Sequence, residues 1–308
     1  MSLIQKAAQQ LSAAGLKTPA AASPAPLRGP ISQPPRMASQ PAQPHPMQTA
    51  SATPRRTTVA DAGLPSRGSA WQLPDQELGD AGQITPSTQR TRLAEEVRVV
   101  ARRILRKWSE PGNQGQVSRS LLVTSAEPGE GKSFTALNLA MSCALEGTPT
   151  TLIDADLMHR GLSDRLRAGD RPGLTDHLRD QGRTPDAFLL CDPRLPEFAM
   201  IAAGTPLSGV DDLPRGEAIR ALIMAAERRR PGGIVIIDAP PVLSSSVAGM
   251  MADCVGTVLL VVKADVTPDS SVQSALDLLE AAGDVGLLLN QTAAFAAEHR
   301  FGTYAPDK

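Results

Sequence analysis

Cysteine, aromatic residues and long apolar runs are scarce in this chain of 308 residues. The three cysteines, Cys143, Cys191 and Cys254, lie far apart, which excludes a disulfide framework or a cysteine zinc motif and indicates reduced thiols of a cytosolic protein. No apolar run approaches the ~20 residues that span a bilayer, and the first residues lack the apolar core of a signal peptide. The net charge of −1 gives no bias toward nucleic acid. We therefore expect a cytoplasmic protein.

Composition divides the chain into four segments. Residues 16–90 contain nearly half of the 27 prolines and show no hydrophobic periodicity, so we predict a disordered linker there. Residues 91–295 form the predicted folded domain, which is long enough for one core, and residues 296–308 form a predicted flexible tail. Apolar residues repeat at helical spacing within residues 1–15, which favours either a short docking helix or a frayed terminus.

A phosphate-binding loop is the most informative pattern in the chain. The apolar strand 121–125 leads into Ala126-Glu127-Pro128-Gly129-Glu130-Gly131-Lys132-Ser133, and a predicted helix runs from Phe134 to about Leu145. This order matches G-x-x-x-x-G-K-[ST], with alanine in place of the first glycine. Backbone N–H groups of such a turn bind phosphates, the lysine neutralises the β- and γ-phosphates, and the serine ligates Mg²⁺. The pattern predicts phosphoryl transfer or nucleotide hydrolysis, with an ordinary glycine-rich turn as the alternative.

Three aspartates follow two further predicted strands. The strand 150–153 ends in Asp154 and Asp156, and the strand 233–237 ends in Asp238. Near-continuous apolar runs suit buried parallel strands, and ligands of open α/β sheets bind beyond the carboxyl ends of such strands. A lone aspartate there would favour a helix N-cap. Three beside a phosphate loop favour a site that holds a metal–water shell and positions a nucleophile.

The remaining sequence alternates between predicted helices and strands. The helices are 91–108, 173–179, 216–229 and 270–282, and the strands are 198–203, 256–263 and 285–290. This alternation predicts an α/β fold with a doubly wound, mostly parallel sheet of the P-loop NTPase type. Four arginines lie largely off the apolar face of the first helix, which favours either a solvated basic face or an interface with a subunit or an acidic partner.

Several motifs together resemble the bacterial tyrosine kinases, a branch of P-loop proteins related to cell-division and partitioning ATPases. They are, in chain order, TSAEPGEGKS, TLIDADL, GLTDHL, IVIIDAPPVL and LLLNQ. The resemblance runs from the helix 91–108 to Asn290. Partitioning ATPases carry a signature lysine early in the loop, where this chain has Glu127, which argues against that branch.

The resemblance implies ATP and Mg²⁺ as cofactors. The loop from Glu127 to Ser133, followed by Phe134, would bind the phosphates. Asn290 would contact the adenine ring.

The resemblance also implies a catalytic set of Lys132, Asp154, Asp156 and Asp238. Ser133, Asp156 and Asp238 would hold Mg²⁺, directly or through water. Asp154 would act as the base toward a tyrosine hydroxyl, for which a carboxylate acceptor is useful because the tyrosine pKa is near 10. Positioning and charge neutralisation supply most of the rate in such reactions, since the transition state is loose and highly charged.

Two of the departures from the family bear on the acceptor and on assembly. Family members usually phosphorylate a tyrosine-rich C-terminal tail, whereas the single tyrosine here is Tyr304. Tyr304 is therefore either the phosphoacceptor or a tail residue with no role. Family members use the pattern E-x-x-R-x-x-R in ring assembly. This chain has Glu95 and Arg98 but Ala101 in place of the last arginine, so the sequence does not decide between a homo-oligomer and a single chain.

The leading hypothesis is a MgATP-dependent protein-tyrosine autokinase that regulates exopolysaccharide polymerisation and export. The resemblance implies a transmembrane chain-length or activator protein as partner, and hence recruitment to the inner face of the plasma membrane. The single tyrosine motivates an alternative, a nucleotide-gated assembly switch with weak or no kinase activity. A partitioning-type ATPase is the third hypothesis.

Overall fold

The computed structural model describes residues 69–88, 90–110, 118–180, 184–206 and 216–292. All of these residues belong to one compact unit that starts at Ala60. The predictions for residues 1–15, for the linker up to residue 68 and for the tail with Tyr304 lie outside the described residues.

An eight-stranded sheet forms the centre of this unit, in the order β1-β4-β5-β3-β6-β2-β7-β8. Every neighbouring pair is parallel except β4 and β5. The strands are β1 (Ser69–Ala70), β2 (Ser120–Ser125), β3 (Thr150–Asp154), β4 (Leu189–Cys191), β5 (Phe198–Ile201), β6 (Ile234–Asp238), β7 (Thr257–Lys263) and β8 (Val285–Asn290). The predicted α/β class and mostly parallel sheet are confirmed.

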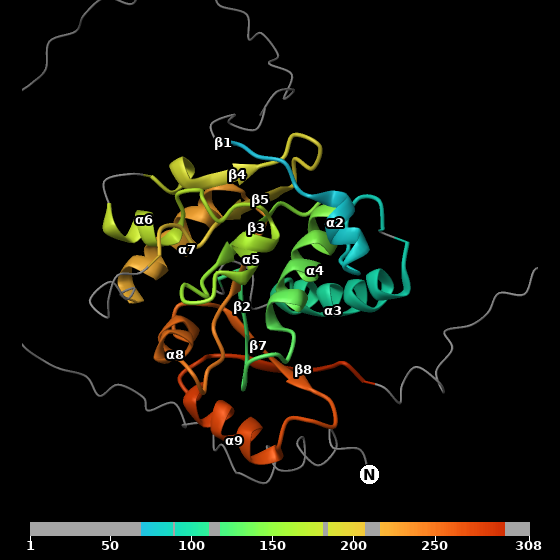
Figure 1. Cartoon of the computed structure of the whole chain (residues 1–308). Helices are drawn as coiled ribbons and strands as arrows, with labels where there is room; N and C mark the ends of the chain where they lie inside the picture. Colours follow the sequence, from blue (N-terminus) through green and yellow to red (C-terminus); the bar gives the residue numbers. More distant parts are fainter. Residues whose placement is uncertain (1–68, 89, 111–117, 181–183, 207–215, 293–308) are drawn as a thin grey trace, which may run out of the picture. The chain divides into compact units, whose positions relative to one another are not determined.

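Helices cover both faces of the sheet (Figure 1). The helical elements are α2 (Asp75–Asp80), α3 (Arg92–Trp108), α4 (Lys132–Leu145), α5 (Gly161–Arg165), α6 (Leu174–Arg179), η1 (Pro185–Phe188), α7 (Gly216–Arg229), α8 (Ser246–Ala252) and α9 (Asp269–Leu278). Successive residues of a strand point to opposite faces. Leu121 and Val123 therefore pack with α3 and α4, while Leu122 packs with α7 and α8. Both faces are buried, which explains why the central strands are apolar throughout.

The opening helix of the predicted domain is confirmed, with a specific start. The Thr91 side chain accepts a hydrogen bond from the Ala94 backbone N–H, which caps the first turn of α3. Part of the basic face is paired within the chain, since the Arg98 Nε lies 2.7 Å from Glu146 Oε1. No helix in the described part of the chain is long and apolar enough to cross a lipid bilayer.

The structure corrects the end of the predicted linker. Residues 69–88 contain β1 and α2, and four apolar side chains of this segment are buried in the core: Trp71, Leu73, Leu78 and Ile84. The Trp71 Nε1 donates to the Leu166 carbonyl at 2.9 Å, and the Ile84 N–H donates to Asn138 Oδ1 at 2.7 Å. Composition misled here because a few large apolar residues suffice to anchor a segment on a core that the rest of the domain already forms.

The other differences concern short elements and the ends of elements. The four short elements α5, η1, β4 and α8 were not predicted, because so few residues show no periodicity. The predicted strand 198–203 is shorter, since the carbonyls of Ala202 and Ala203 accept hydrogen bonds from the start of α6. The predicted helix 270–282 ends at Leu278, after which i to i−3 hydrogen bonds form turns.

Candidate functional site

The loop between β2 and α4 has the backbone that its glycines predict. Gly129 and Gly131 have φ angles of +82° and +97°, in the left-handed region that glycine enters without strain. A Cβ on Gly131 would collide with the side-chain amide of Asn290, which would have to move away from its present bond to the Glu130 carbonyl. α4 begins at Lys132, which places a helix N-terminus, with its free N–H groups, at the loop.

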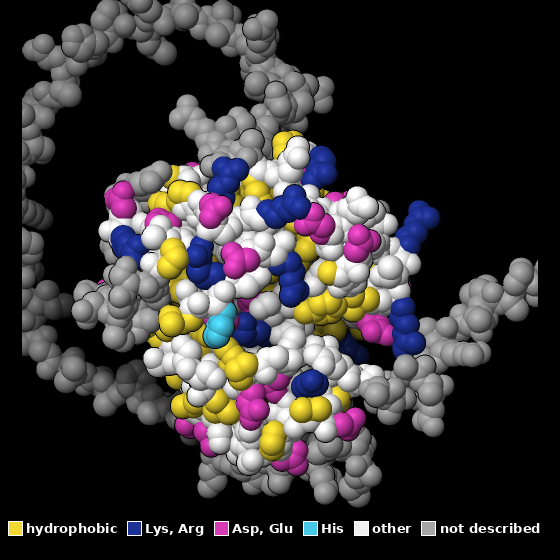
Figure 2. Space-filling view, viewed as in Figure 1, with side chains coloured by type: hydrophobic (Ala, Val, Ile, Leu, Met, Phe, Trp, Pro, Cys, Tyr) yellow, Lys and Arg dark blue, Asp and Glu magenta, His cyan; other side chains and the backbone are white. Residues whose placement is uncertain are grey.

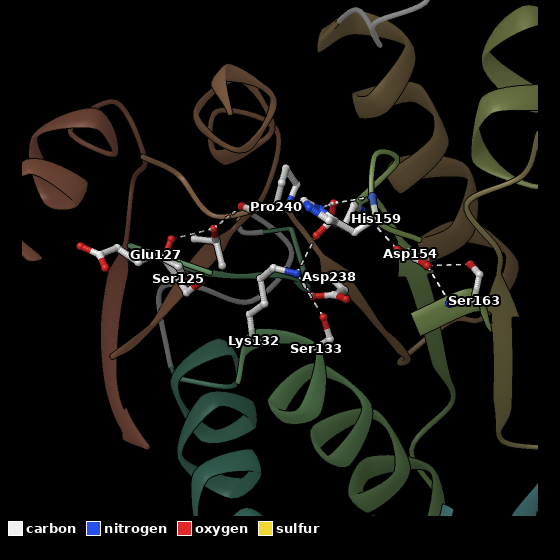
Figure 3. A network of polar contacts seen from close by, with 11 residues as sticks. Ser125, Glu127, Lys132, Ser133, Asp154, His159, Ser163, Asp238 and Pro240 are labelled. Carbon is white, nitrogen blue, oxygen red and sulfur yellow. Dashed lines mark hydrogen bonds and ion pairs between the residues drawn. The ribbon is translucent and has the colours of Figure 1, made fainter. Parts of the chain in front are cut away.

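Lys132 lies at the centre of the site (Figure 3). Its Nζ is 2.8 Å from Asp156 Oδ2, 3.1 Å from Ser133 Oγ and 3.9 Å from Asp238 Oδ1. Burial lowers the pKa of Lys132, but the charge of Asp238 and the bond to Asp156 outweigh burial and raise the pKa above its usual value. Lys132 is therefore a cation held among carboxylates, close to where phosphates would bind.

Asp238 is a buried carboxylate without a hydrogen-bond partner. It ends β6, and neither of its oxygens has such a partner within the described residues. Burial raises its pKa to about 7, although the charge of Lys132 opposes this shift. Lys132 Nζ, 3.9 Å away, gives Asp238 an ion pair but no hydrogen bond, and a buried acceptor without a hydrogen bond is costly. A hydrated Mg²⁺ beside Ser133 fits this donor set, since Mg²⁺ prefers one or two carboxylates plus phosphates and waters.

Asp156 differs because both of its oxygens are paired. Oδ2 accepts from Lys132, and Oδ1 accepts from the His159 Nδ1 at 3.0 Å and from the His159 backbone N–H at 3.3 Å. Burial raises the pKa of Asp156, but the hydrogen bond and charge of Lys132 outweigh burial and hold the pKa below its usual range. Asp156 is therefore ionised at neutral pH.

Asp154, at the end of β3, is sealed by hydrogen bonds. Oδ2 accepts from the Ser163 N–H at 2.8 Å and from the Ser163 hydroxyl at 2.6 Å, while Oδ1 accepts from the Asp156 N–H at 3.2 Å. The Ser163 Oγ in turn accepts from the Ala203 N–H at 2.8 Å. Burial raises the pKa of Asp154, against the effect of the Ser163 bonds. Asp154 thus ties α5 and the end of the β5 segment to the site.

The far side of the loop is braced by residues from β8 and the start of α9. The Asn290 Nδ2 donates to the Glu130 carbonyl at 2.9 Å. The buried Glu130 carboxylate accepts from the Glu127 N–H at 2.9 Å and from the Thr267 hydroxyl. The Glu127 carboxylate accepts from the Ser271 hydroxyl at 2.7 Å. Asn290, predicted to contact adenine, therefore also holds the loop backbone.

The structure brings most of the predicted site residues to one edge of the sheet. The loop residues 127–134 include Lys132. Asp154 and Asp238 are the last residues of β3 and β6, and Asp156 follows β3 by two positions. Tyr304 lies outside the described residues. Among described side chains, no group of three or more His, Cys, Asp or Glu could hold a metal ion.

Sequence reasoning missed four contact residues: His159, Ser163, Thr267 and Ser271. No motif marks them, because each contributes one polar group whose partner is set by the fold. A separate cavity of about 310 Å³, lined by residues of η1 and the end of α7, contains none of the predicted site residues.

Comparison with known proteins finds relatives named as tyrosine-protein kinases and one named as a polysaccharide transport protein. Tyrosine-protein kinase CpsD of Streptococcus agalactiae serotype Ia is 28% identical over 188 residues, which cover 60% of this chain and 79% of that protein. The succinoglycan biosynthesis transport protein ExoP of Rhizobium meliloti is 30% identical over 210 residues, which cover 62% of this chain and 26% of that protein. No model of a protein family matches the chain.

Solved structures share the fold. The kinase domain of the Escherichia coli tyrosine kinase ETK superposes with a TM-score of 0.54 at 24% identity, covering 76% of this chain and 93% of that chain. The chimerical protein CapA2B2 superposes with a TM-score of 0.55 at 22% identity, covering 75% of this chain and 95% of that chain.

Proposed function

We propose that the chain belongs to the bacterial tyrosine kinases, which its similarity to tyrosine-protein kinases CpsD supports, and that it is a MgATP-dependent protein-tyrosine autokinase of exopolysaccharide or capsule biosynthesis. One structural observation supports the proposal independently of the names of the relatives. The lysine of the phosphate loop converges with Asp156 and Asp238 at the carboxyl edge of a parallel sheet, which is the arrangement that phosphoryl transfer requires.

The nucleotide-binding roles follow from the contacts. The loop N–H groups and Lys132 bind the phosphates, and Lys132 exchanges its bond to Asp156 for phosphate oxygens. Ser133 and Asp238 hold Mg²⁺, because Asp238 is a buried acceptor without a hydrogen-bond partner in the described structure. When bound, Mg²⁺ neutralises charge on the phosphates. Phe134 and Asn290 complete the nucleotide site.

The proton acceptor of the tyrosine hydroxyl is Asp154 in this proposal. Its raised pKa makes it a better proton acceptor than an ordinary carboxylate. Its bonds to Ser163 and to the Asp156 N–H must loosen before a hydroxyl can reach it. Asp156, which is less buried and faces Lys132, supports the metal shell.

Tyr304 is the phosphoacceptor in this proposal, because it is the only tyrosine of the chain. The partner is a transmembrane polysaccharide chain-length or activator protein, which places the kinase at the inner face of the plasma membrane. The name of ExoP, a biosynthesis transport protein, supports this partner class.

Intact-mass measurement of the purified full chain before and after Mg²⁺-ATP tests the activity. We expect one added phosphate in the wild type and none in Tyr304→Phe or Lys132→Met. A phosphate that persists in Tyr304→Phe contradicts the acceptor assignment. If the wild type binds ATP but gains no phosphate, the nucleotide-gated switch, which the single tyrosine favours, replaces the kinase.

A further inference from the structure

His159 contacts the same carboxylate as the lysine of the phosphate loop, yet neither the motifs nor the proposed mechanism uses it. We propose that His159 is a positioning residue, which holds Asp156 in place when Lys132 turns to the phosphates of the nucleotide. The inference rests on the proposed function in one respect, that Lys132 binds phosphate.

The two partners of Asp156 occupy different oxygens. Lys132 bonds Oδ2 at 2.8 Å, whereas the His159 Nδ1 and backbone N–H bond Oδ1 at 3.0 and 3.3 Å. Because the carboxylate accepts, the ring donates from Nδ1. The departure of Lys132 therefore removes one bond and leaves the histidine bonds intact.

Lys132 cannot keep all of its present partners once phosphates bind. Its ammonium group has three donors, and it now lies within 4 Å of Ser133, Asp156 and Asp238. A phosphate-loop lysine neutralises the β- and γ-phosphates. Among the side chains that the structure describes, His159 is then the one that still bonds the Asp156 carboxylate.

A local turn fixes the histidine relative to the aspartate. The Arg160 N–H donates to the Asp156 carbonyl at 2.7 Å, so residues 156–160 form a closed turn with the two side chains three positions apart. The His159 side chain is 72% exposed, and Figure 2 shows histidine atoms, in cyan, at the described surface next to a Lys or Arg side chain. Its exposure means that the ring can be replaced without opening the core.

The contact acts on the metal through Asp156, so metal-dependent binding is the property to measure. Hydrogen-bond partners of metal-supporting carboxylates typically change metal affinity by about 10- to 100-fold. A ring that only touches Asp156 by chance would change nothing, and general damage to the loop would weaken nucleotide binding with and without metal.

The experiment measures binding of a fluorescent ATP analogue (mant-ATP) to the full chain, in EDTA and across a Mg²⁺ titration. For His159→Leu we expect the Mg²⁺ concentration at half-maximal binding to rise about 10-fold, with unchanged affinity in EDTA and recovery at high Mg²⁺. His159→Asn should restore most of the loss, because its amide nitrogen occupies the position of Nδ1. Met158→Ala is the matched control, since Met158 is the 74% exposed neighbour and should match the wild type.

Three results would overturn the proposal. His159→Leu could show a wild-type Mg²⁺ titration, it could lose affinity equally in EDTA, or His159→Asn could be no better than His159→Leu. The failure of the proposed function is a separate outcome. If the wild type binds mant-ATP with Mg²⁺ but gains no phosphate by mass, the kinase assignment fails while the binding data still decide the role of His159.

Discussion

Two aspartates lie opposite each other on neighbouring strands, and they differ in their hydrogen bonding. Asp154 of β3 and Asp238 of β6 are paired in register and both are fully buried. Asp154 accepts three hydrogen bonds, whereas Asp238 accepts none from the described residues. The hydrogen bonds of Asp154 stabilise the native state, whereas the lack of hydrogen bonds at Asp238 is costly and points to a ligand. Asp154 therefore braces the site in addition to its proposed role as proton acceptor, and Asp238 is the better candidate for a metal ligand.

The largest expected effect is the loss of phosphotransfer in Asp238→Asn. The substitution removes the charge that holds Mg²⁺, so we expect activity to fall at least about 100-fold. Stability should change little, because Asp238 makes no hydrogen bond that the substitution would break, and the removal of a buried charge offsets the loss of the 3.9 Å ion pair with Lys132. Intact-mass kinetics with Mg²⁺-ATP and thermal unfolding of the same sample measure both. A clear loss of stability with activity retained would show that Asp238 stabilises the fold and does not hold Mg²⁺.

Asp154→Asn, in contrast, should lower the stability of the fold. The amide is a weaker acceptor for the Ser163 N–H and hydroxyl, and its NH₂ group would face donors, so we expect a loss of about 1–3 kcal/mol. Denaturant unfolding without nucleotide measures it. Phosphotransfer should also fall if Asp154 is the base, and a fully stable variant would show that its hydrogen bonds do not brace the site.

The raised pKa of Asp238 predicts a pH dependence of stability. The folded state binds a proton at Asp238 up to pH about 7, whereas the unfolded carboxyl releases it near 3.8. Since the native state binds more protons in this window, the contribution of Asp238 to stability falls as pH rises, by at most about 1.4 kcal/mol per pH unit. Unfolding at pH 5, 6 and 7 should show this slope in the wild type and lose it in Asp238→Asn. If stability changed with pH in the same way in the wild type and in Asp238→Asn, the raised pKa of Asp238 would be contradicted.

The smallest expected effect is the loss of stability in Ser163→Ala, which tests whether the hydrogen bonds of Asp154 stabilise the fold. Ser163→Ala removes one hydroxyl bond to Asp154 and one acceptor of the Ala203 N–H, but it keeps the backbone bond. We expect a loss of about 1–2 kcal/mol in denaturant unfolding, smaller than in Asp154→Asn. Combined with Asp154→Asn, the loss should be less than additive, because the two side chains share one bond. Additive losses would mean that the two residues act separately.

Much of the candidate site could be predicted because its signals are local. The loop residues 127–134 are contiguous, and the aspartates lie at the ends of strands that apolar runs mark. Parallel strands share a carboxyl edge, so a correct fold class brings these groups together. The folded segment 69–88 was missed, because its composition is that of a linker and only its burial against the core shows otherwise.

Local sequence patterns are enough to predict the phosphate loop, the sheet that carries it and the edge where the aspartates lie. Three features follow from the folded arrangement alone: the hydrogen bonds of Asp154, their absence at Asp238 and the contacts that hold the loop. The reason is sequence separation: Glu130 is bound by Thr267 and Asn290, which lie 137 and 160 positions away. Such partners follow no local periodicity, because they meet only after the strands have paired and the loops have been placed beside one another.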